Sequence, residues 1–318
     1  MTEALRDDNE YERPRLAASG GVRVRVPAKV NLHLGVGPLR DDGYHELHTV
    51  YHAISLFDEV TARRGDTLSL TMEGEGAGEL VLDESNLVIR AAEALAAHAG
   101  VPTRARLHLR KQIPLAAGLA GGSADAAATL VACEALWGLG FTREELAQVA
   151  ADLGADVPFL LYGGTALGTG YGEQISPVLA HGAAWHWVVA LADDGLSTPE
   201  VYGELDRLRA AGQAPAPMGT PDALLAALRQ HDPSVLAAAL GNDLAPAALS
   251  LRPGLAEVLD AGATAGALAG LVSGSGPTCV FLARDAEHAE ALATHLEAAE
   301  VCRAVGTAHG PVAGARLV

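Results

Sequence analysis

The sequence predicts an α+β protein made of two domains. Helical and strand-like periodicities alternate irregularly along its 318 residues, without the regular strand–helix–strand repeat of a parallel α/β sheet. Hydrophobic residues make up 49% of the chain, which is enough apolar material for a substantial core. A chain of this length usually divides into more than one domain.

The change in sequence texture after Tyr171 suggests where the domains meet. Residues 1–20 are dense in charges of both signs and contain no apolar stretch typical of a secretory signal, so we expect a disordered tail. We then place an N-terminal domain at residues 21–180 and a C-terminal domain at residues 181–318.

Three segments of the first domain alternate apolar and polar residues with the period of two that is typical of half-buried strands. They begin at Val22, Leu68 and Leu107. Three helices are expected near residues 86–100, 123–137 and 142–154.

Capping residues support the first and third of these helices. Ser85 and Asn86 offer an N-cap to the first, and Gly100 follows its last apolar residue. Thr142 and Glu145 form a capping box for the third. The middle helix is rich in alanine and is expected to open at Ser123.

The second domain is expected to contain two apolar strands, over residues 187–191 and 278–283. Helical stretches are expected over residues 221–229 and 234–240, after Pro253, and around Leu292 and Leu296. The intervening segments 193–199 and 210–221 are rich in turn-forming residues, and Ser273–Pro277 forms a tight Gly/Ser turn.

Composition excludes several classes of partner. The formal net charge of −17 argues against nucleic acid, because binding a phosphate backbone requires a basic face. No apolar run approaches the roughly 20 residues that span a bilayer, so no membrane partner is expected. Cys133, Cys279 and Cys302 are far apart, which fits a reducing compartment and predicts a cytoplasmic protein. We expect a monomer or a homodimer.

A glycine-rich segment between the third strand and the alanine-rich helix is the strongest functional signal. It comprises Pro114, Leu115, Ala116, Ala117, Gly118, Leu119, Ala120, Gly121, Gly122, Ser123 and Ala124. Backbone N–H groups freed by glycines, together with a helix N-terminus, form an anion-binding cradle sized for phosphates. The alternative is an ordinary strand–turn–helix connection with small residues. The segment matches neither a Walker A loop nor a dinucleotide-binding fingerprint.

Two further segments favour phosphoryl transfer over a plain turn. Lys29 ends an apolar strand, and Asp156 lies in an apolar turn after a helix. Each alone is typical of structure, since a lone lysine is usually a solvated edge charge and an aspartate before proline usually forms a turn. Together with the cradle, they supply the cation and the hydroxyl-orienting carboxylate that phosphoryl transfer requires.

The segments Pro27–Leu32, Pro114–Ala124 and Ser273–Thr278 resemble the three motifs of the GHMP kinases, in order and at plausible separation. The resemblance implies a ribosomal-protein-S5-domain-2-like N-terminal domain and a ferredoxin-like C-terminal domain. Asp42–His45 and the segment around Asp156 further resemble those members that phosphorylate a cytidine-diphosphate-linked methylerythritol.

The resemblance implies roles for individual residues. Lys29 and Asp156 would be the catalytic pair, and Asn31 would help to hold the hydroxyl-bearing end of the substrate. Tyr44 would stack on the cytosine ring, with His45 on the ring's edge. In the segment that begins at Thr198, which is also assigned to the substrate, Tyr202 would close the other face. ATP would be the phosphoryl donor, and Mg²⁺ is inferred from the chemistry alone.

The glycine-rich segment departs from the family pattern at three alanines. Ala116, Ala117 and Ala120 stand where many members carry glycine. A methyl group is costly at positive φ. We therefore expect these alanines to adopt ordinary angles, and only Gly118, Gly121 and Gly122 to need unusual ones.

Other functions remain open at this point. A GHMP kinase for homoserine or a mevalonate-type alcohol would share the three motifs but would have no use for Tyr44 and His45. A catalytically silent ligand-binding protein would have no reason to retain both Lys29 and Asp156. His45, His48 and His52 match no zinc-binding pattern, so the metal ligands are not predicted.

Overall fold

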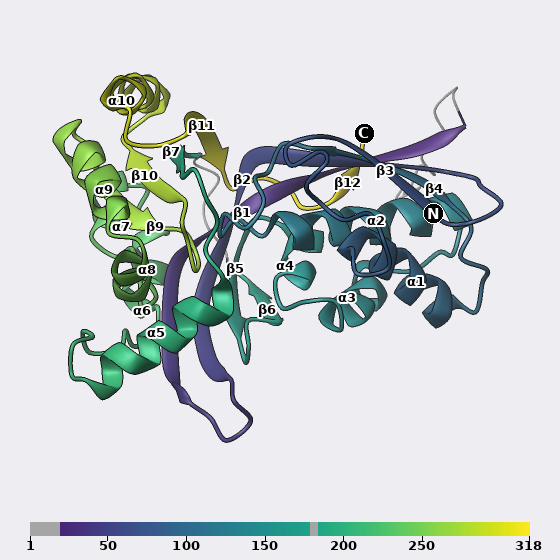
Figure 1. The fold of residues 1–318 in the computed structure, drawn as a ribbon, viewed down its shortest axis with the longest axis horizontal. Helices are drawn as coiled ribbons and strands as arrows, with labels where there is room; N and C mark the ends of the chain where they lie inside the picture. Colours follow the sequence, from purple (N-terminus) through teal and green to yellow (C-terminus); the bar gives the residue numbers. More distant parts are fainter. Residues whose placement is uncertain (1–19, 179–183) are drawn as a thin grey trace, which may run out of the picture.

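The structure, a computed structural model, describes residues 20–178 and 184–318 (Figure 1). The expected tail, apart from Gly20, and the expected boundary between residues 180 and 181 lie outside these ranges. The described residues form two β-sheets with helices packed against each. The α+β class predicted from the sequence is therefore confirmed.

The larger sheet is built around a long hairpin of β1 and β2. Its strands are β1 (Gly21–Leu39), β2 (His45–Arg63), β3 (Ser69–Gly74), β4 (Arg106–Lys111), β5 (Thr165–Thr169), β6 (Gln174–Pro177), β8 (Gly241–Asn242) and β12 (Arg316–Leu317). The main order is β12-β1-β2-β4-β3, while β5 pairs with β2 and β6, and β8 pairs with β1. The β3–β4 and β1–β8 pairs are parallel, and the other pairs are antiparallel.

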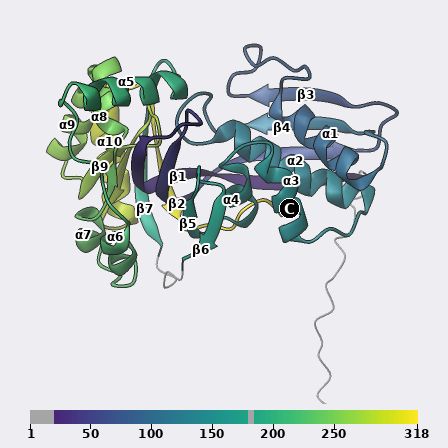
Figure 2. The same cartoon turned by 90° about the horizontal axis from the view of Figure 1, so that it is seen from below.

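Four helices lie on one side of this sheet in both views (Figures 1 and 2). They are α1 (Leu87–Ala99), α2 (Gly121–Trp137), α3 (Arg143–Ala151) and α4 (Val157–Tyr162). Helix α2 is almost completely buried, because its many alanine side chains are small and let neighbouring elements approach closely. Asn86 caps α1, and Thr142 with Glu145 forms the predicted capping box of α3.

The smaller sheet has four antiparallel strands in the order β11-β7-β10-β9. They are β7 (Trp185–Leu191), β9 (Ala269–Val272), β10 (Cys279–Ala283) and β11 (Ala304–Gly310). The crossovers contain α5 (Thr198–Ala210), α6 (Asp222–Ala227), α7 (Pro233–Ala237), α8 (Ala245–Leu251), α9 (Gly254–Thr264) and, before β11, α10 (Ala286–Ala299). This is the expected ferredoxin-like strand order.

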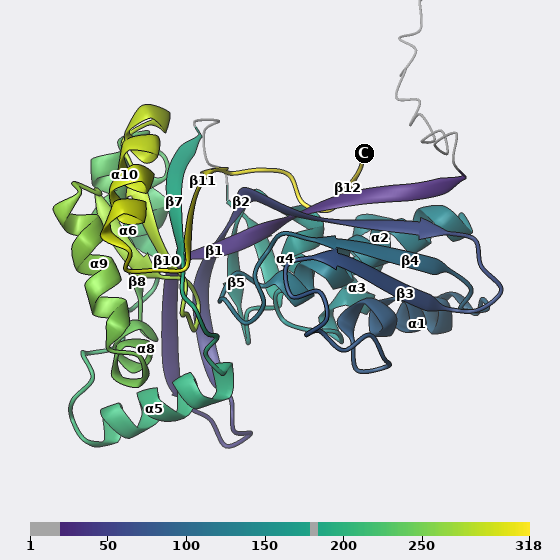
Figure 3. The same ribbon diagram turned by 45° about the horizontal axis from the view of Figure 1, so that its top comes forward.

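The β1–β2 hairpin passes through both halves of the molecule (Figure 3). Val24 and Val30 of β1 belong to the core under the larger sheet, whereas Leu34 and Val36 belong to the second core together with Val188 of β7. Two short strands from the C-terminal part of the chain, β8 and β12, return to pair with β1. A boundary near residue 180 remains a prediction.

Irregularities in the β1–β2 ladder flank the segment that carries the candidate catalytic lysine. The register shifts between Pro27 and Ala28 and again between Asn31 and His33. Such bulges re-aim side chains and are frequent next to active sites. In the described ranges, no helix is long and apolar enough to cross a membrane.

Candidate active site

Lys29 and Asp156 come together as predicted. The Lys29 Nζ atom lies 3.7 Å from Asp156 Oδ2, and the lysine is 5% exposed. Lys29 is held in the middle of β1, whereas Asp156 directly precedes α4. The Asp156 side chain faces Lys29 and Tyr51 rather than the N–H groups at the start of its own helix. Its carboxylate is thus directed at the site.

A chain of hydrogen bonds fixes the amide of Asn31 beside the lysine. Lys29 Nζ donates to Asn31 Oδ1 at 2.7 Å, and Asn31 Nδ2 donates to Thr49 Oγ1 at 2.7 Å. The Thr49 hydroxyl in turn donates to the His33 carbonyl oxygen at 2.9 Å. All four residues are buried, so the orientation of the ammonium group is strongly constrained.

The segment Pro114–Ala124, here called the phosphate loop, packs directly on Lys29 and on the third motif. The Lys29 backbone N–H donates to the Leu119 carbonyl at 3.2 Å, and Ser273 Oγ donates to the Gly118 carbonyl at 3.1 Å. A Cβ at Gly274 would lie 3.2 Å from Lys29 Nζ. The structure therefore brings together all three segments that resemble kinase motifs.

The expected backbone angles of the phosphate loop were partly wrong. Ala116 and Ala120 have positive φ angles of 47° and 58°, although they carry a methyl group. Gly118, at 72°, does have the expected positive φ, but Gly121 and Gly122 lie inside α2, which begins two residues before Ser123.

Packing accounts for the conformation of Ala116 and for the glycine at position 121. The Ala116 methyl group sits against Gly195, where an added Cβ would approach it to 2.7 Å, so tertiary contacts hold this alanine in a strained conformation. Gly121 is small because a Cβ there would lie 3.1 Å from both Ile113 and Lys111 Nζ. Its requirement is for space and not for an unusual φ.

The start of α2 faces the loop with the geometry of an anion site. The first N–H groups of a helix have no partner inside the helix, and the helix dipole adds partial positive charge there. Ala124 N–H is the first to bond within this helix, to the Ala120 carbonyl, which leaves the preceding N–H groups available. A phosphate can be held here in spite of the strongly acidic chain.

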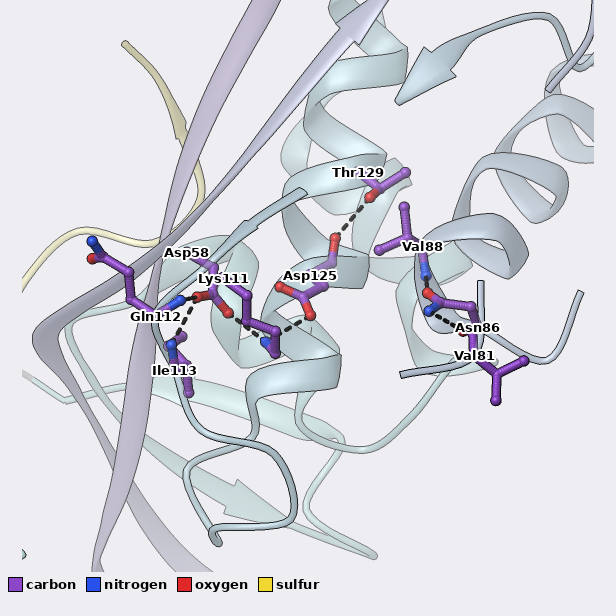
Figure 4. A network of polar contacts seen from close by, with 9 residues as sticks. All are labelled: Asp58, Val81, Asn86, Val88, Lys111, Gln112, Ile113, Asp125 and Thr129. Atoms are coloured by element: carbon purple, nitrogen blue, oxygen red, sulfur yellow. Dashed lines mark hydrogen bonds and ion pairs between the residues drawn. The ribbon is translucent and has the colours of Figure 1, made fainter. Parts of the chain in front are cut away.

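A buried ionic network supports the loop from below (Figure 4). Lys111 Nζ lies 2.6 Å from Asp58 Oδ2 and 2.8 Å from Asp125 Oδ2. The other Asp58 oxygen accepts the N–H groups of Gln112 and Ile113, the residues that lead into the loop. The network thus joins β2, the end of β4 and the first turns of α2.

Burial acts on the proton equilibria of this network. It raises the pKa of Asp125 well above its usual value, against the opposing effect of Lys111. Burial also acts to lower the pKa of Lys111, but Asp125 and Asp58 together outweigh it, so this pKa is raised and the lysine stays charged. Lys29 and Lys111 are the two lysines of the chain, and both are buried next to the loop.

Two cavities adjoin the loop on either side of Leu115. One, of about 560 Å³, is bounded by residues 114–117 of the loop, by Asp193 and Asp194, and by Arg303. The other, of about 350 Å³, lies over Asn86, Lys111 and Asp125. Together they provide room along the loop for a molecule larger than phosphate.

The residues assigned to the cytosine lie in two aromatic pairs. The rings of His45 and Tyr202 stack with centroids 5.3 Å apart, and Tyr44, which is 64% exposed, is tilted against Tyr171 at 5.3 Å. Burial, and next the charge of Asp156, raise the pKa of Tyr202. Tyr202 is therefore within electrostatic reach of the Asp156 carboxylate.

His45 already has a protein partner at each ring nitrogen. Its Nδ1 lies 2.9 Å from the Gly37 carbonyl oxygen, and its Nε2 lies 3.3 Å from Asp206 Oδ2. Thr198, at the start of α5, shares a 2.8 Å hydrogen bond with Ser275 of the third motif. This contact ties the predicted substrate segment to the turn beside the phosphate loop.

Several residues of the site had not been predicted from the sequence. Tyr51 lies beside both Lys29 and Asp156, Asp206 contacts His45, and Asn242 donates to the carbonyl groups of Val272 and Gly274. Thr49 and Tyr51 share one face of β2, two residues apart. A period of two along β2 could therefore have identified them had the strand been recognised.

Among residues 20–178 and 184–318, no group of three or more His, Cys, Asp or Glu side chains could hold a metal ion. A magnesium ion that arrives with ATP needs no such group, because Mg²⁺ usually keeps several waters and binds through phosphate oxygens and one or two protein oxygens. Near the loop, the half-buried residues Ser123 and Asp156 offer such oxygens.

Known proteins resemble this chain in both halves. The family of GHMP kinases N terminal domains matches residues 86–164, and that of GHMP kinases C terminal domains matches residues 224–302. A homoserine kinase from Cytophaga hutchinsonii has a TM-score of 0.74 and 20% identity, covering 96% of this chain and 99% of its own. At that identity, the likeness shows the fold alone.

Two other proteins are much closer in sequence. A crystal structure of 4-(cytidine 5'-diphospho)-2C-methyl-D-erythritol kinase is 35% identical, with a TM-score of 0.72, and covers 90% of this chain and 98% of its own. A Salinispora tropica protein named 4-diphosphocytidyl-2-C-methyl-D-erythritol kinase is 74% identical over 100% of both chains. This chain therefore belongs to the 4-diphosphocytidyl-2-C-methyl-D-erythritol kinase family of the GHMP kinases.

Proposed function

We propose that this chain is the kinase that transfers the terminal phosphoryl group of ATP to the 2-hydroxyl of 4-diphosphocytidyl-2-C-methyl-D-erythritol. The reaction belongs to the non-mevalonate synthesis of isoprenoid precursors. The observation that carries the proposal is the Lys29–Asp156 pair, 3.7 Å apart, packed against the carbonyl side of the phosphate loop. Ammonium, carboxylate and anion cradle are the parts that phosphoryl transfer requires.

ATP is assigned to the phosphate loop, residues 114–124. The N–H groups at the start of α2 would receive the phosphate oxygens, with Ser123 as an additional hydroxyl donor. The cavities on either side of Leu115 would accommodate the nucleoside. Mg²⁺ would enter with ATP and neutralise charge on its phosphates.

Asp156 and Lys29 act on the acceptor hydroxyl and on the transferred group. Asp156 accepts a hydrogen bond from the hydroxyl and aligns its oxygen with the terminal phosphorus. The new P–O bond forms as the bond to the bridging oxygen breaks, ADP leaves, and the hydroxyl proton passes to the carboxylate. Lys29 stabilises the charge on the transferred oxygens, and Asn31 fixes its ammonium group.

The aromatic pairs form the proposed cytidine subsite. Tyr44 is exposed enough to stack on a cytosine ring, and Tyr202 would close the opposite face, near Thr198. The edge of cytosine carries both donor and acceptor groups. Cytosine would bind here by replacing the 3.3 Å contact between His45 Nε2 and Asp206 Oδ2, so that the imidazole and the partly exposed carboxylate both face the edge of the ring. A cytoplasmic monomer or homodimer remains our expectation for the assembled enzyme.

A coupled assay of ADP release separates this function from its competitors. Purified protein with ATP and Mg²⁺ is offered the cytidine diphosphate alcohol, homoserine and mevalonate in parallel. We expect turnover of the first alone, because only it can use the aromatic subsite. Comparable kcat/KM for homoserine or mevalonate would contradict the specificity, and no turnover of any alcohol would favour a catalytically silent binding protein.

A further inference from the structure

Tyr51 lies at the centre of β2, directly beside the catalytic pair. It is 2% exposed and pairs with Asn31 across the β1–β2 ladder. Its ring stacks on Phe159, with centroids 4.9 Å apart and planes at 24°. Phe159 belongs to α4, the helix that Asp156 precedes, so the tyrosine ring and the carboxylate share one rigid support.

The Tyr51 hydroxyl faces the Asp156 side chain closely enough that a hydrogen bond between them is among the causes that raise the pKa of Tyr51. Burial is the largest cause and the charge of Asp156 the next, and together they hold this pKa well above its usual value of 10.0. The phenol therefore keeps its proton throughout the neutral range, and an ionised carboxylate has none to give. In this bond Tyr51 donates and Asp156 accepts.

The turn between β5 and β6 keeps the tyrosine in place. A Cβ at Gly172 would lie 2.4 Å from the Tyr51 hydroxyl oxygen, and one at Gly168 would lie 2.6 Å from its ring carbon Cε2. Both glycines therefore leave space that the tyrosine fills. With Phe159 on one side and this turn on another, the phenol is held where it meets the carboxylate.

Charged and titratable groups face Tyr51 from four elements. Lys29 from β1 places its Nζ 5.8 Å from the centroid of the tyrosine ring. Asp156 faces it from the start of α4, Glu173 from the β5–β6 turn and Tyr202 from α5. Of these four groups, Asp156 is the one that a hydrogen bond links to the Tyr51 hydroxyl, and it is the carboxylate of the proposed catalytic pair.

We propose that Tyr51 is a positioning residue, whose hydroxyl holds the Asp156 carboxylate in the orientation that receives the acceptor hydroxyl. The inference rests on the proposed kinase function. A donor bonded to a carboxylate stabilises its ionised form, which is the form that can accept a hydrogen bond from the substrate. Tyr51 thus orients Asp156 towards the acceptor hydroxyl.

Tyr51→Phe tests this role, because it keeps the ring on Phe159 and removes only the hydroxyl. With the cytidine diphosphate alcohol, we expect kcat at neutral pH to fall on the order of 10-fold. KM for ATP should stay within about twofold, since the phosphate loop is untouched. Tyr162→Phe, which removes a phenol from the far end of α4, is the matched control and should leave kcat unchanged.

The outcomes distinguish the proposed role of Tyr51 from the proposed kinase function. An active wild-type enzyme together with an unchanged kcat in Tyr51→Phe overturns the positioning role and leaves the kinase function intact. The same conclusion follows if KM for ATP rises in step with the fall in kcat, since a general packing defect would affect both. A wild-type protein without turnover of the cytidine substrate contradicts the kinase function and the inference together.

Discussion

Ala116 and Gly118 stand two residues apart in the phosphate loop, and both have positive φ angles. They differ in what surrounds the position of Cβ. The Ala116 methyl group fits against Gly195, whereas a Cβ at Gly118 would lie 2.1 Å from the Ser273 carbonyl oxygen. Backbone angle alone therefore does not decide which of these positions must be glycine; the approach of the third motif does.

Single substitutions at these two positions should have unequal effects on stability and on ATP binding. Gly118→Ala adds a clash with the Ser273 backbone to an unfavourable φ, so we expect a loss of about 2–4 kcal/mol in unfolding free energy and weaker ATP binding. Ala116→Gly relieves strain but adds chain entropy to the unfolded state, so its unfolding free energy should change by less than about 1 kcal/mol. Urea denaturation and KM for ATP measure both. Equal losses in the two variants would contradict this account.

Sequence patterns identified local features such as helix caps well, and contacts between residues far apart in the chain poorly. The capping residues Asn86 and Thr142 were found because capping depends on neighbours in the chain. Lys29 and Asp156 were grouped by the residue types that phosphoryl transfer requires, and the family resemblance then made them the catalytic pair. Nothing local to either residue encodes a contact across 127 positions (156 − 29). The positive φ of Ala116 likewise depends on a contact with a residue far along the chain, Gly195, 79 positions away (195 − 116).

At the scale of elements, the Lys111 network connects β2, β4 and α2 beneath the phosphate loop. A buried ion pair adds little net stability, because desolvation offsets the attraction, but removing one partner leaves an uncompensated charge. Here one lysine serves two buried carboxylates, Asp58 and Asp125. The network fixes where β4 ends and thus where the loop begins.

Lys111→Met should therefore be strongly destabilising. We expect a loss of about 3–5 kcal/mol in unfolding free energy, because Asp58 and Asp125 would remain buried without a cation. Arg110→Met removes an exposed cation from the adjacent position of β4 and should change stability by less than about 1 kcal/mol. Chemical denaturation of both proteins provides the comparison. Similar stability of the two variants would show that the network does not support the loop.

Elements were predictable where their periodicity was visible. The strands that became β1, β3 and β4 and the helices α1 and α3 showed clear periods or caps. Residues 49–54 of β2 are buried on both faces, which removes the alternation that marks a strand. With only six residues, α4 is too short to show a helical period. Missing β2 also concealed Tyr51.

At the scale of the whole molecule, His52 marks the junction between the two sheets. It is fully buried on β2, its Nδ1 lies 2.8 Å from Thr165 Oγ1 of β5, and its ring meets the edge of Trp187 of β7. Gly310 at the end of β11 closes against its Nε2. Burial lowers the pKa of His52 from 6.5 to about 3.

Protonation of His52 should therefore lower the free energy of unfolding in mild acid. The folded state binds this proton less tightly than the unfolded state, so the contribution is fully present above pH 6.5 and is lost as pH falls towards 3. Between pH 7.5 and pH 5, it should remove about 2 kcal/mol of unfolding free energy. His52→Gln cannot titrate and should lack this part of the pH dependence. Parallel slopes for wild type and variant in urea denaturation would refute the assignment.

The central claim is that Asp156, held between Lys29 and Tyr51, aligns the acceptor hydroxyl with ATP bound on the phosphate loop. The most direct test is kcat of Asp156→Asn with the cytidine diphosphate alcohol, with the exposed Asp152→Asn as control. The account predicts a fall in kcat of about 10²–10⁴-fold with KM for ATP nearly unchanged, and wild-type behaviour in the control. Turnover close to that of the wild type in Asp156→Asn would contradict it.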